Sequence, residues 1–209
     1  MPSFERIGIL GAGRAGTAFA RAAARKDIAV QIASTRTPTQ MRYHLMQYAP
    51  QAHAVLADDI AIGVDLIILA VPQEDLDEVQ PGWLAGRIVI DATNRWDDEP
   101  LPEWFEAGLA TGLSSSEVIA QRFNNATIVK ALNHISHWAM DAPATSEDRA
   151  AVVASDDSGA AELVAQFVAA LGYTPVVTPR LADGRAMEPD SPFFNVAATA
   201  EQLSHHVLD

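Results

Sequence analysis

Short runs of apolar residues recur along the chain, each followed by a polar or helix-forming stretch. The runs are continuous rather than alternating, which is typical of strands buried on both faces of a parallel sheet. They predict strands at 6–10, 29–33, 54–56, 64–71, 87–92, 127–132, 151–154 and 174–177. Helical patterns are expected between them at 16–26, 39–48, 75–79, 114–122, 158–171 and 195–207. This alternation predicts an α/β fold with an open, doubly wound, mainly parallel sheet of the Rossmann type and a small C-terminal extension.

A glycine-rich turn follows the first predicted strand directly, and an alanine-rich helical segment comes after it. Gly11 would permit the tight turn, Gly13 would let the backbone approach a pyrophosphate, and Gly16 would let the helix pack closely on the strand. The free N–H groups at the start of the helix would then face the phosphates. Because the motif stands between a strand and a helix, we interpret it as a dinucleotide-binding loop rather than an ordinary glycine turn. The loop consists of Gly11, Ala12, Gly13, Arg14, Ala15 and Gly16.

The end of the second predicted strand indicates which dinucleotide is bound. NAD-binding versions of this fold place an acidic residue about 20 positions beyond the first glycine. No carboxylate occurs between Ala29 and His53, and Ser34, Thr35 and Arg36 follow the strand instead. Two hydroxyl groups and a guanidinium suit a 2′-phosphate, which arginine can bind with two hydrogen bonds. The alternative is a polar loop with no ligand; we expect NADP(H).

Composition and charge exclude several other classes of protein. The chain has no cysteine, which rules out disulfides, thiolate metal sites and cysteine nucleophiles, and no metal site is expected. A net charge of −13 argues against general affinity for nucleic acid, which requires clustered Lys and Arg. The N-terminus lacks a signal-peptide pattern, and the longest apolar run, 66–71, is too short to span a bilayer. We therefore expect a cytoplasmic protein without a membrane partner.

Several further motifs, considered together, resemble one family. They are Ser34-Thr35-Arg36, Ala70-Val71-Pro72, Asp91-Ala92-Thr93-Asn94, Lys130-Ala131-Leu132-Asn133 and the segment from Leu181 through Arg185 to Pro189. Their order is similar to that in NADP-dependent oxidoreductases that use coenzyme F420, a 5-deazaflavin. The NADPH-binding part of some ferric-reductase-like membrane proteins is similar as well. The resemblance extends over nearly the whole chain.

The resemblance implies hydride transfer between NADP(H) and a deazaflavin stacked on the nicotinamide at the carboxyl edge of the sheet. It implies that Ala70, Val71 and Pro72 border the adenosine and the nicotinamide ribose, and that Asn94 and Asn133 lie near the nicotinamide. Residues 1–140 would form the NADP-binding domain. Residues 141–209 would be a strand-helix extension that continues the same sheet, borders the substrate cleft and contributes dimer contacts.

Other interpretations stay open from the sequence alone. The second substrate could be a ferric chelate, a flavin, an imine or a β-hydroxy acid, or the chain could be a non-catalytic NADP(H) sensor. Asn133 and His134 are the candidates for catalytic contacts, and Arg185 and Glu188 could form a salt bridge. The aromatic residues Trp96, Trp104, Trp138, Phe193 and Phe194 could line a flat pocket.

The last predicted helix carries an apolar stripe, formed by Phe194, Ala197, Ala198, Leu203 and Val207. Such a stripe needs a partner surface, either on this chain or on a second copy. The resemblance favours the second copy, since family members pair through their C-terminal regions. We therefore expect a homodimer.

Overall fold

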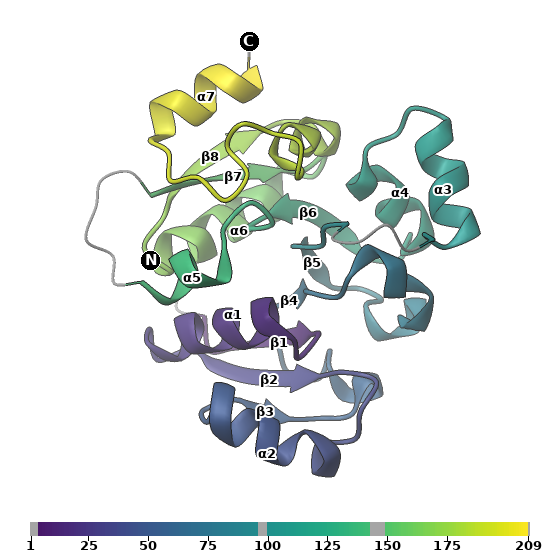
Figure 1. The fold of residues 1–209 in the computed structure, drawn as a ribbon, viewed down its shortest axis with the longest axis vertical. Helices are drawn as coiled ribbons and strands as arrows, with labels where there is room; N and C mark the ends of the chain where they lie inside the picture. The colour runs from purple at the N-terminus through teal and green to yellow at the C-terminus, as the bar shows by residue number, and fades with distance from the viewer. Residues whose placement is uncertain (1–3, 96–99, 143–148, 209) are drawn as a thin grey trace.

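In the computed structural model, which describes residues 4–95, 100–142 and 149–208, eight strands form one sheet in the order β3-β2-β1-β4-β5-β6-β7-β8 (Figure 1). All neighbouring pairs are parallel except β6 and β7, which are antiparallel. The predicted α/β class with a mainly parallel sheet is therefore confirmed. The strands are β1 (Arg6–Leu10), β2 (Ala29–Ala33), β3 (His53–Ala54), β4 (Leu66–Leu69), β5 (Ile88–Asp91), β6 (Thr127–Ala131), β7 (Ala150–Ala154) and β8 (Thr174–Thr178).

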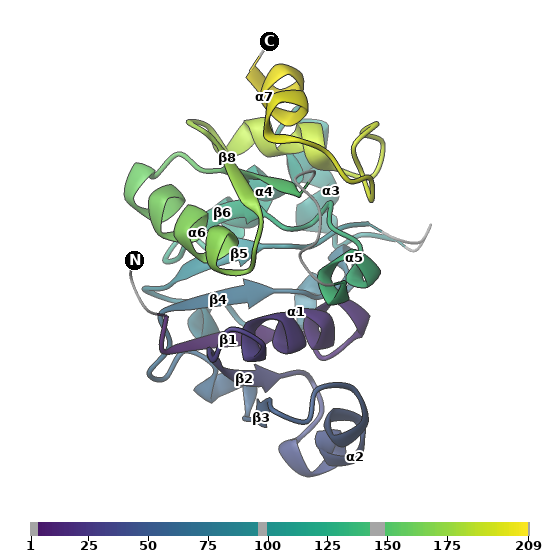
Figure 2. The same ribbon diagram turned by 90° about the vertical axis from the view of Figure 1, so that its left-hand side faces the viewer.

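Seven α-helices lie within the described residues, together with four 3₁₀ helices. The α-helices are α1 (Arg14–Ala24), α2 (Pro38–Tyr48), α3 (Glu103–Ala110), α4 (Ser115–Arg122), α5 (His137–Asp141), α6 (Ser158–Ala170) and α7 (Ala200–Leu208). The 3₁₀ helices are η1 (Ala57–Asp59), η2 (Gln73–Glu78), η3 (Pro81–Trp83) and η4 (Leu181–Met187). Figures 1 and 2 show α2 at one end of the molecule and α7 at the other.

The core has two main layers because successive strand residues point to opposite faces of the sheet. Ile7 and Ile9 of β1 belong to the cluster that includes α1 and α6. Leu10 belongs to the opposite cluster, which includes α3 and α4. A smaller third cluster lies between β7, β8 and α7. Both faces of β1 are thus covered, so a ligand can approach this strand only at its end.

Several of the predicted elements were wrong in type or extent. The crossover helix expected at 75–79 is the 3₁₀ helix η2; Pro81 cannot donate the backbone hydrogen bond that a longer α-helix would need. The terminal helix begins at Ala200 rather than at residue 195, where Asn195 has a φ of 57°. Helices α3 and α5 were not expected from the sequence. Among the described residues, no helix combines the length and apolar character needed to cross a membrane.

The apolar stripe of the C-terminal segment does not need a second copy. Leu203 is 1% exposed and Ala198 is 3% exposed, both within the cluster that covers β7 and β8 of the same chain. The backbone N–H of Ala150 also donates to the Ala198 carbonyl at 3.0 Å. Our reason for expecting a dimer was therefore wrong, since this chain covers most of the stripe itself. The homodimer stays a prediction, as does the division at residue 140.

Candidate functional site

The glycine loop connects β1 to α1 at the carboxyl edge of the sheet. Gly11 has a φ of 118°, and a Cβ atom added there would lie 2.3 Å from the Ala70 carbonyl oxygen. A Cβ on Gly16 would lie 1.9 Å from the Gly11 carbonyl oxygen, so this helix start depends on glycine. A Cβ on Gly13 would meet nothing within 4 Å. Two of the glycines are therefore needed for packing, whereas Gly13 faces open space.

Helix α1 begins directly after Gly13, and no side chain caps its N-terminus. The first backbone N–H groups of an α-helix have no partners within the helix, and they attract anions together with the helix dipole. Gly13 bonds to the helix only through its carbonyl, which accepts hydrogen bonds from the Thr17 N–H and the Thr17 hydroxyl. The N–H groups at the start of α1 are thus free to bind an anionic group.

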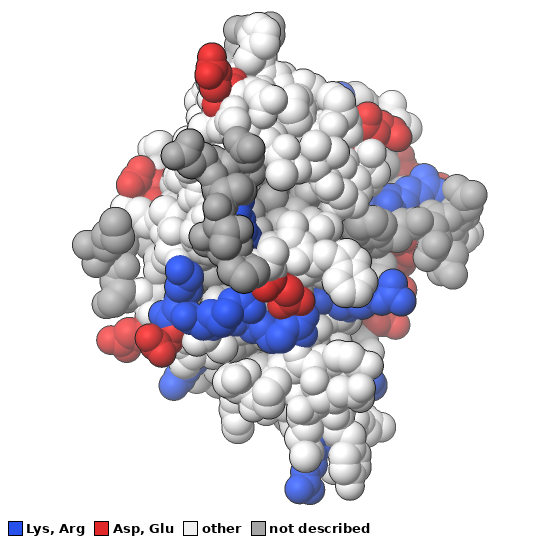
Figure 3. Space-filling view, turned by 60° about the vertical axis from the view of Figure 1, so that its left-hand side comes forward, with Lys and Arg blue, Asp and Glu red and all other residues white. Residues whose placement is uncertain are grey.

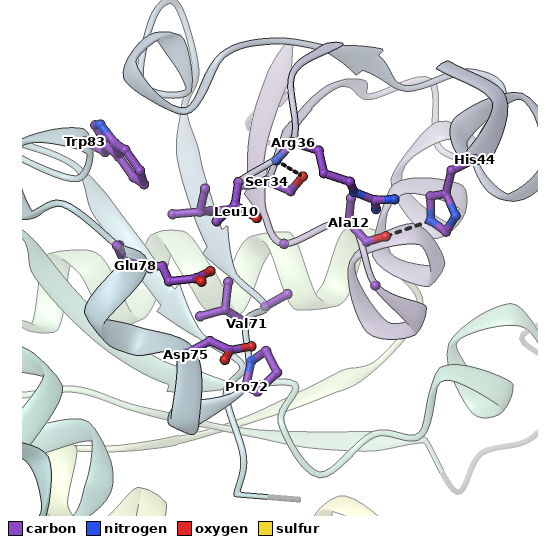
Figure 4. A pocket seen from close by; sticks show the side chains of 15 residues that line it. Leu10, Ala12, Ser34, Arg36, His44, Val71, Pro72, Asp75, Glu78 and Trp83 are labelled. Atoms are coloured by element: carbon purple, nitrogen blue, oxygen red, sulfur yellow. Dashed lines mark hydrogen bonds between the residues drawn. The ribbon is translucent and has the colours of Figure 1, made fainter. Parts of the chain in front are cut away.

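A pocket of about 300 Å³ lies on one side of this loop (Figure 4). Ser34, Thr35 and Arg36 all line it. The backbone N–H of Arg36 donates to the Ser34 hydroxyl at 3.1 Å, and α2 begins just after, with its capping box at Thr37 and Gln40. No described residue forms an ion pair with the Arg36 guanidinium. The pocket therefore offers an arginine without an ion-pair partner beside two hydroxyl groups.

Several residues of this first pocket had no signal in the sequence. His44, Asp75, Glu78, Val79 and Trp83 line it from α2, η2 and η3. Figure 4 shows Glu78 and Asp75 across the pocket from Arg36. These residues come from separate elements, and only the packing of those elements on the sheet brings them together. Local sequence patterns could not have found them.

A second pocket of about 590 Å³ lies on the other side of the loop. It shares Gly13, Ala70, Val71 and Pro72 with the first pocket, so the two form neighbouring chambers around the glycine loop. Its other lining residues include Arg14, Ala15, Asn94, Leu132, Asn133 and a segment from Ile135 to Trp138. All of the predicted site residues line one or both of these pockets except Gly16 and His134. Gly16 packs beneath the loop instead.

Two buried asparagines join the ends of β5 and β6 beside the second pocket. Asn94 donates through Nδ2 to the Asn133 carbonyl at 2.8 Å. Asn133 donates through Nδ2 to Asn94 Oδ1 at 3.2 Å and to the Met187 carbonyl at 2.7 Å. Both hydrogens of the Asn133 amide are used, and its Oδ1 atom is buried without a partner among the described residues. This acceptor is enclosed by the protein rather than exposed to the pocket.

A buried ion pair fixes these strand ends. Lys130 and Asp91 have side chains 1% and 0% exposed, and Lys130 Nζ lies 3.1 Å from Asp91 Oδ2. Lys130 also donates to the Thr93 carbonyl at 2.9 Å, and Asp91 accepts from the Ser116 hydroxyl and the Thr93 N–H. Because Thr93 immediately precedes Asn94, this network holds the turn that carries the first asparagine.

His134 does not line either pocket, although it follows Asn133 in the chain. Its ring is buried, and neither ring nitrogen has a partner among the described residues. Burial, and to a lesser extent the charge of Lys130, lowers the pKa of His134 to about 3, so the ring is neutral at physiological pH. Leu132, with a φ of 64°, turns the chain just before these residues. Of the two candidate catalytic residues, only Asn133 is placed at a pocket wall.

The other sequence expectations met different outcomes. Arg185 donates to the Gly112 carbonyl and Glu188 accepts from the Ser115 hydroxyl, so the expected salt bridge between them was wrong. Arg185 thereby attaches η4 to the loop that follows α3, and Glu188, just after η4, contacts the first residue of α4. Among the aromatic residues, Trp138 lines the second pocket and Trp96 lies outside the described residues. Trp104 donates to Asp77, and Phe193 packs beside His206, both away from the two pockets.

Charge near the glycine loop differs from the charge of the whole chain. Figure 3 shows a band of Lys and Arg side chains across the middle of one face, at the level of α1 in Figure 1. Helix α1 carries Arg14, Arg21 and basic residues at its C-terminal end. Asp141 binds Arg21 at 2.5 Å and Arg25 at 3.6 Å, and Arg21 foremost lowers the pKa of that carboxyl. A local cationic surface therefore exists in a chain whose net charge is −13.

The fold and site together define a class of protein. A glycine loop after β1, an uncapped helix start, and a hydroxyl-arginine cluster after β2 are the parts of a Rossmann dinucleotide site. Among the described residues, no group of three His, Asp or Glu side chains is arranged to hold a metal ion. The class is that of dinucleotide-binding proteins of the Rossmann type.

Comparison with known proteins makes the class more specific. Residues 6–95 match the model of the family described as NADP oxidoreductase coenzyme F420-dependent. Over 185 residues the chain is 26% identical to the metalloreductase STEAP3 of Rattus norvegicus, covering 88% of this chain and 36% of that protein. The chain thus spans little more than a third of this relative. The resemblance stated from the sequence is confirmed over the matched residues, where the chain is similar to NADP-dependent oxidoreductases.

Solved structures share the fold. The hypothetical protein SMa0349 of Sinorhizobium meliloti is 25% identical, with a TM-score of 0.77 over 92% of this chain and 94% of that one. A protein of Arthrobacter sp. FB24, proposed in its name to be an F420-dependent NADP reductase, is 23% identical, with a TM-score of 0.71 and coverage of 88% of both chains. The reductive aminase of Aspergillus terreus has a TM-score of 0.59 at 15% identity, with 88% of this chain covering 58% of that one. At these last two identities the likeness shows the fold alone.

Proposed function

We propose that this chain transfers a hydride between NADP(H) and a flat redox partner, with coenzyme F420 as the expected partner. The observation that carries the proposal is the pair of chambers that meet at Gly13, Ala70, Val71 and Pro72. One chamber ends in Ser34, Thr35 and Arg36, and the other is lined by Asn94 and Asn133. These two ends match the two ends of an NADP molecule whose pyrophosphate lies over the glycine loop.

In this arrangement the chain's residues bind and orient the cofactor. The N–H groups at the start of α1 receive the pyrophosphate, and Arg36 with its neighbouring hydroxyls receives the 2′-phosphate. Asn94 and Asn133 line the chamber that would receive the nicotinamide. When bound, NADP(H) supplies the hydride. The same fold binds NADPH in the reductive aminase of Aspergillus terreus.

The second partner occupies the wider chamber against the segment that precedes and begins α5. Trp138 is 75% exposed there, and its ring centroid lies 4.6 Å from that of His137. A large exposed aromatic side chain at a pocket wall suits stacking with a planar ring. Hydride transfer needs two rings held face to face away from water, and it needs no nucleophile from the protein. The name of the matching family model supports F420 as that partner.

Arg36→Ala tests the assignment of the 2′-phosphate. Loss of a charge-assisted contact costs about 1.5–3 kcal/mol, which corresponds to roughly a tenfold to hundredfold weaker affinity. We expect this loss for NADPH and almost no change for NADH, which lacks the 2′-phosphate. Fluorescence titration of both cofactors measures the effect, and an equal loss for the two would contradict the assignment.

The function is tested by following NADPH oxidation by the full chain with F420, with free flavins and with ferric chelates as separate acceptors. We expect oxidation that depends on both the chain and F420, and that is slower with NADH. Preferential reduction of a ferric chelate would instead favour the activity that the metalloreductase relative's name describes. NADPH binding without oxidation by any acceptor would indicate a non-catalytic NADP(H) sensor.

A further inference from the structure

His44 contacts the glycine loop from a helix that the sequence did not connect with it. It lies on α2, which also contributes Met41 and Leu45 to the core. Its Nε2 atom lies 2.7 Å from the Ala12 carbonyl oxygen, and Figure 4 shows this contact at the edge of the first pocket. A carbonyl can only accept a hydrogen bond, so Nε2 carries the hydrogen and donates it.

This hydrogen bond fixes the orientation of one particular peptide group. A trans peptide is planar, with its C=O and N–H pointing in opposite directions, and the described residues contain no cis peptide bond. The Ala12 carbonyl belongs to the same peptide as the Gly13 N–H. By holding the carbonyl toward α2, His44 directs the Gly13 N–H away from α2. No described residue accepts a hydrogen bond from that N–H.

Other contacts hold the imidazole in place. Its ring centroid lies 4.8 Å from that of Tyr48, one turn further along α2. The Tyr48 carbonyl accepts a hydrogen bond from the Arg21 guanidinium, and Arg21 also binds Asp141. Helix α2 is thereby attached to α1, whose N-terminus forms the same anion site. The donor and the loop that it contacts are therefore fixed relative to each other.

We propose that His44 is a positioning residue for the pyrophosphate, which holds the Ala12–Gly13 peptide so that the Gly13 N–H faces the phosphates. The inference rests on the proposed binding of NADP(H) across Gly13. Without His44 the loop would still bind the pyrophosphate, but the Ala12–Gly13 peptide would be free to rotate, and the Gly13 N–H would point less accurately at the phosphates. Because every dinucleotide has a pyrophosphate, this role is independent of the 2′-phosphate.

Proximity to Arg36 suggests a competing role that the experiment separates. Figure 4 shows the Arg36 side chain extending toward His44. If His44 bound the 2′-phosphate beside Arg36, its removal would weaken NADPH and spare NADH. If it orients the Gly13 N–H, removal weakens both cofactors equally.

The test compares His44→Ala and His44→Gln in the full chain, with titrations of NADPH, NADH and 2′-AMP, which has no pyrophosphate. Loss of one net hydrogen bond is expected to weaken both dinucleotides by about threefold to tenfold in His44→Ala. Binding of 2′-AMP should be unchanged. Glutamine keeps a side-chain N–H donor, so His44→Gln should restore most of the affinity. His53→Ala, at an exposed position on β3 outside both pockets, is the matched control and should match the wild type.

Three results would overturn the inference: unchanged dinucleotide affinity in a folded His44→Ala variant, a loss confined to NADPH, or an equal loss of 2′-AMP. Thermal unfolding of each variant establishes that it is folded. If the wild-type chain bound no dinucleotide at all, that result would contradict the proposed function itself. Normal NADPH binding by both the wild type and His44→Ala would contradict only the role of His44.

Discussion

Gly13→Val is expected to abolish NADPH and NADH binding while leaving the fold intact. A Cβ at this position meets no protein atom within 4 Å, so the larger side chain does not disturb the packing. Gly13 has a φ of −81° and an extended ψ of −162°, a conformation that valine adopts readily. The side chain would instead occupy the space that the pyrophosphate needs. We expect affinity to fall by more than about a hundredfold, since both the close approach and the helix N–H contacts are lost.

Two controls accompany this measurement. Gly82→Val adds the same side chain at a glycine where a Cβ also meets no protein atom within 4 Å and which lies outside both pockets. This variant should bind NADPH normally. Gly16→Ala should unfold or distort the loop, because its Cβ would lie 1.9 Å from the Gly11 carbonyl oxygen. Normal NADPH affinity in a Gly13→Val variant with a native circular-dichroism spectrum would contradict our placement of the cofactor.

Lys130→Met is expected to cause the largest loss of stability. The substitution keeps the apolar stem of the side chain, and it leaves the Asp91 carboxylate buried without its cation. Removing one partner of a buried ion pair typically costs about 3–5 kcal/mol of unfolding free energy. The Thr93 carbonyl loses its donor as well, which loosens the turn before Asn94. Chemical denaturation measures the change in unfolding free energy.

The double variant Lys130→Met with Asp91→Asn separates the effect of the stranded charge from the effect of lost packing. Removing both charges should recover a substantial part of the stability, because a buried pair contributes little beyond its own desolvation cost. If the single variant unfolded within about 1 kcal/mol of the wild type, below the range expected for an unpaired buried charge, the pair would not have this role.

The sequence predicted the parts of the fold that local patterns encode. The glycine loop, the second strand and its polar end are each contained in a few consecutive residues, and the structure has them in the expected order. Helix α4 begins where the serines predicted it, with Ser114 and Glu117 forming a capping box. Residues 34–36 could be connected with the loop because parallel neighbouring strands end at the same edge of a sheet.

What the sequence could not predict depends on packing between distant elements. His44 reaches Ala12 only because α2 lies beside the loop, and the lining by Glu78 and Trp83 depends on two short 3₁₀ helices. Asn133 and His134 are neighbours in the chain and follow the left-handed residue Leu132, yet only Asn133 lines the second pocket. The amphipathic pattern at the C-terminus identified a buried face correctly but could not tell that β7 and β8 of the same chain cover it.

The central claim is that the chain binds NADP(H) across the glycine loop with the 2′-phosphate at Arg36. The most direct test is a titration of the wild-type chain with NADPH and with NADH under the same conditions. We predict saturable binding of both, with NADPH at least about tenfold tighter, because a charge-assisted contact to the 2′-phosphate is worth that much. Equal affinity for the two cofactors, or no binding of NADPH, would contradict it.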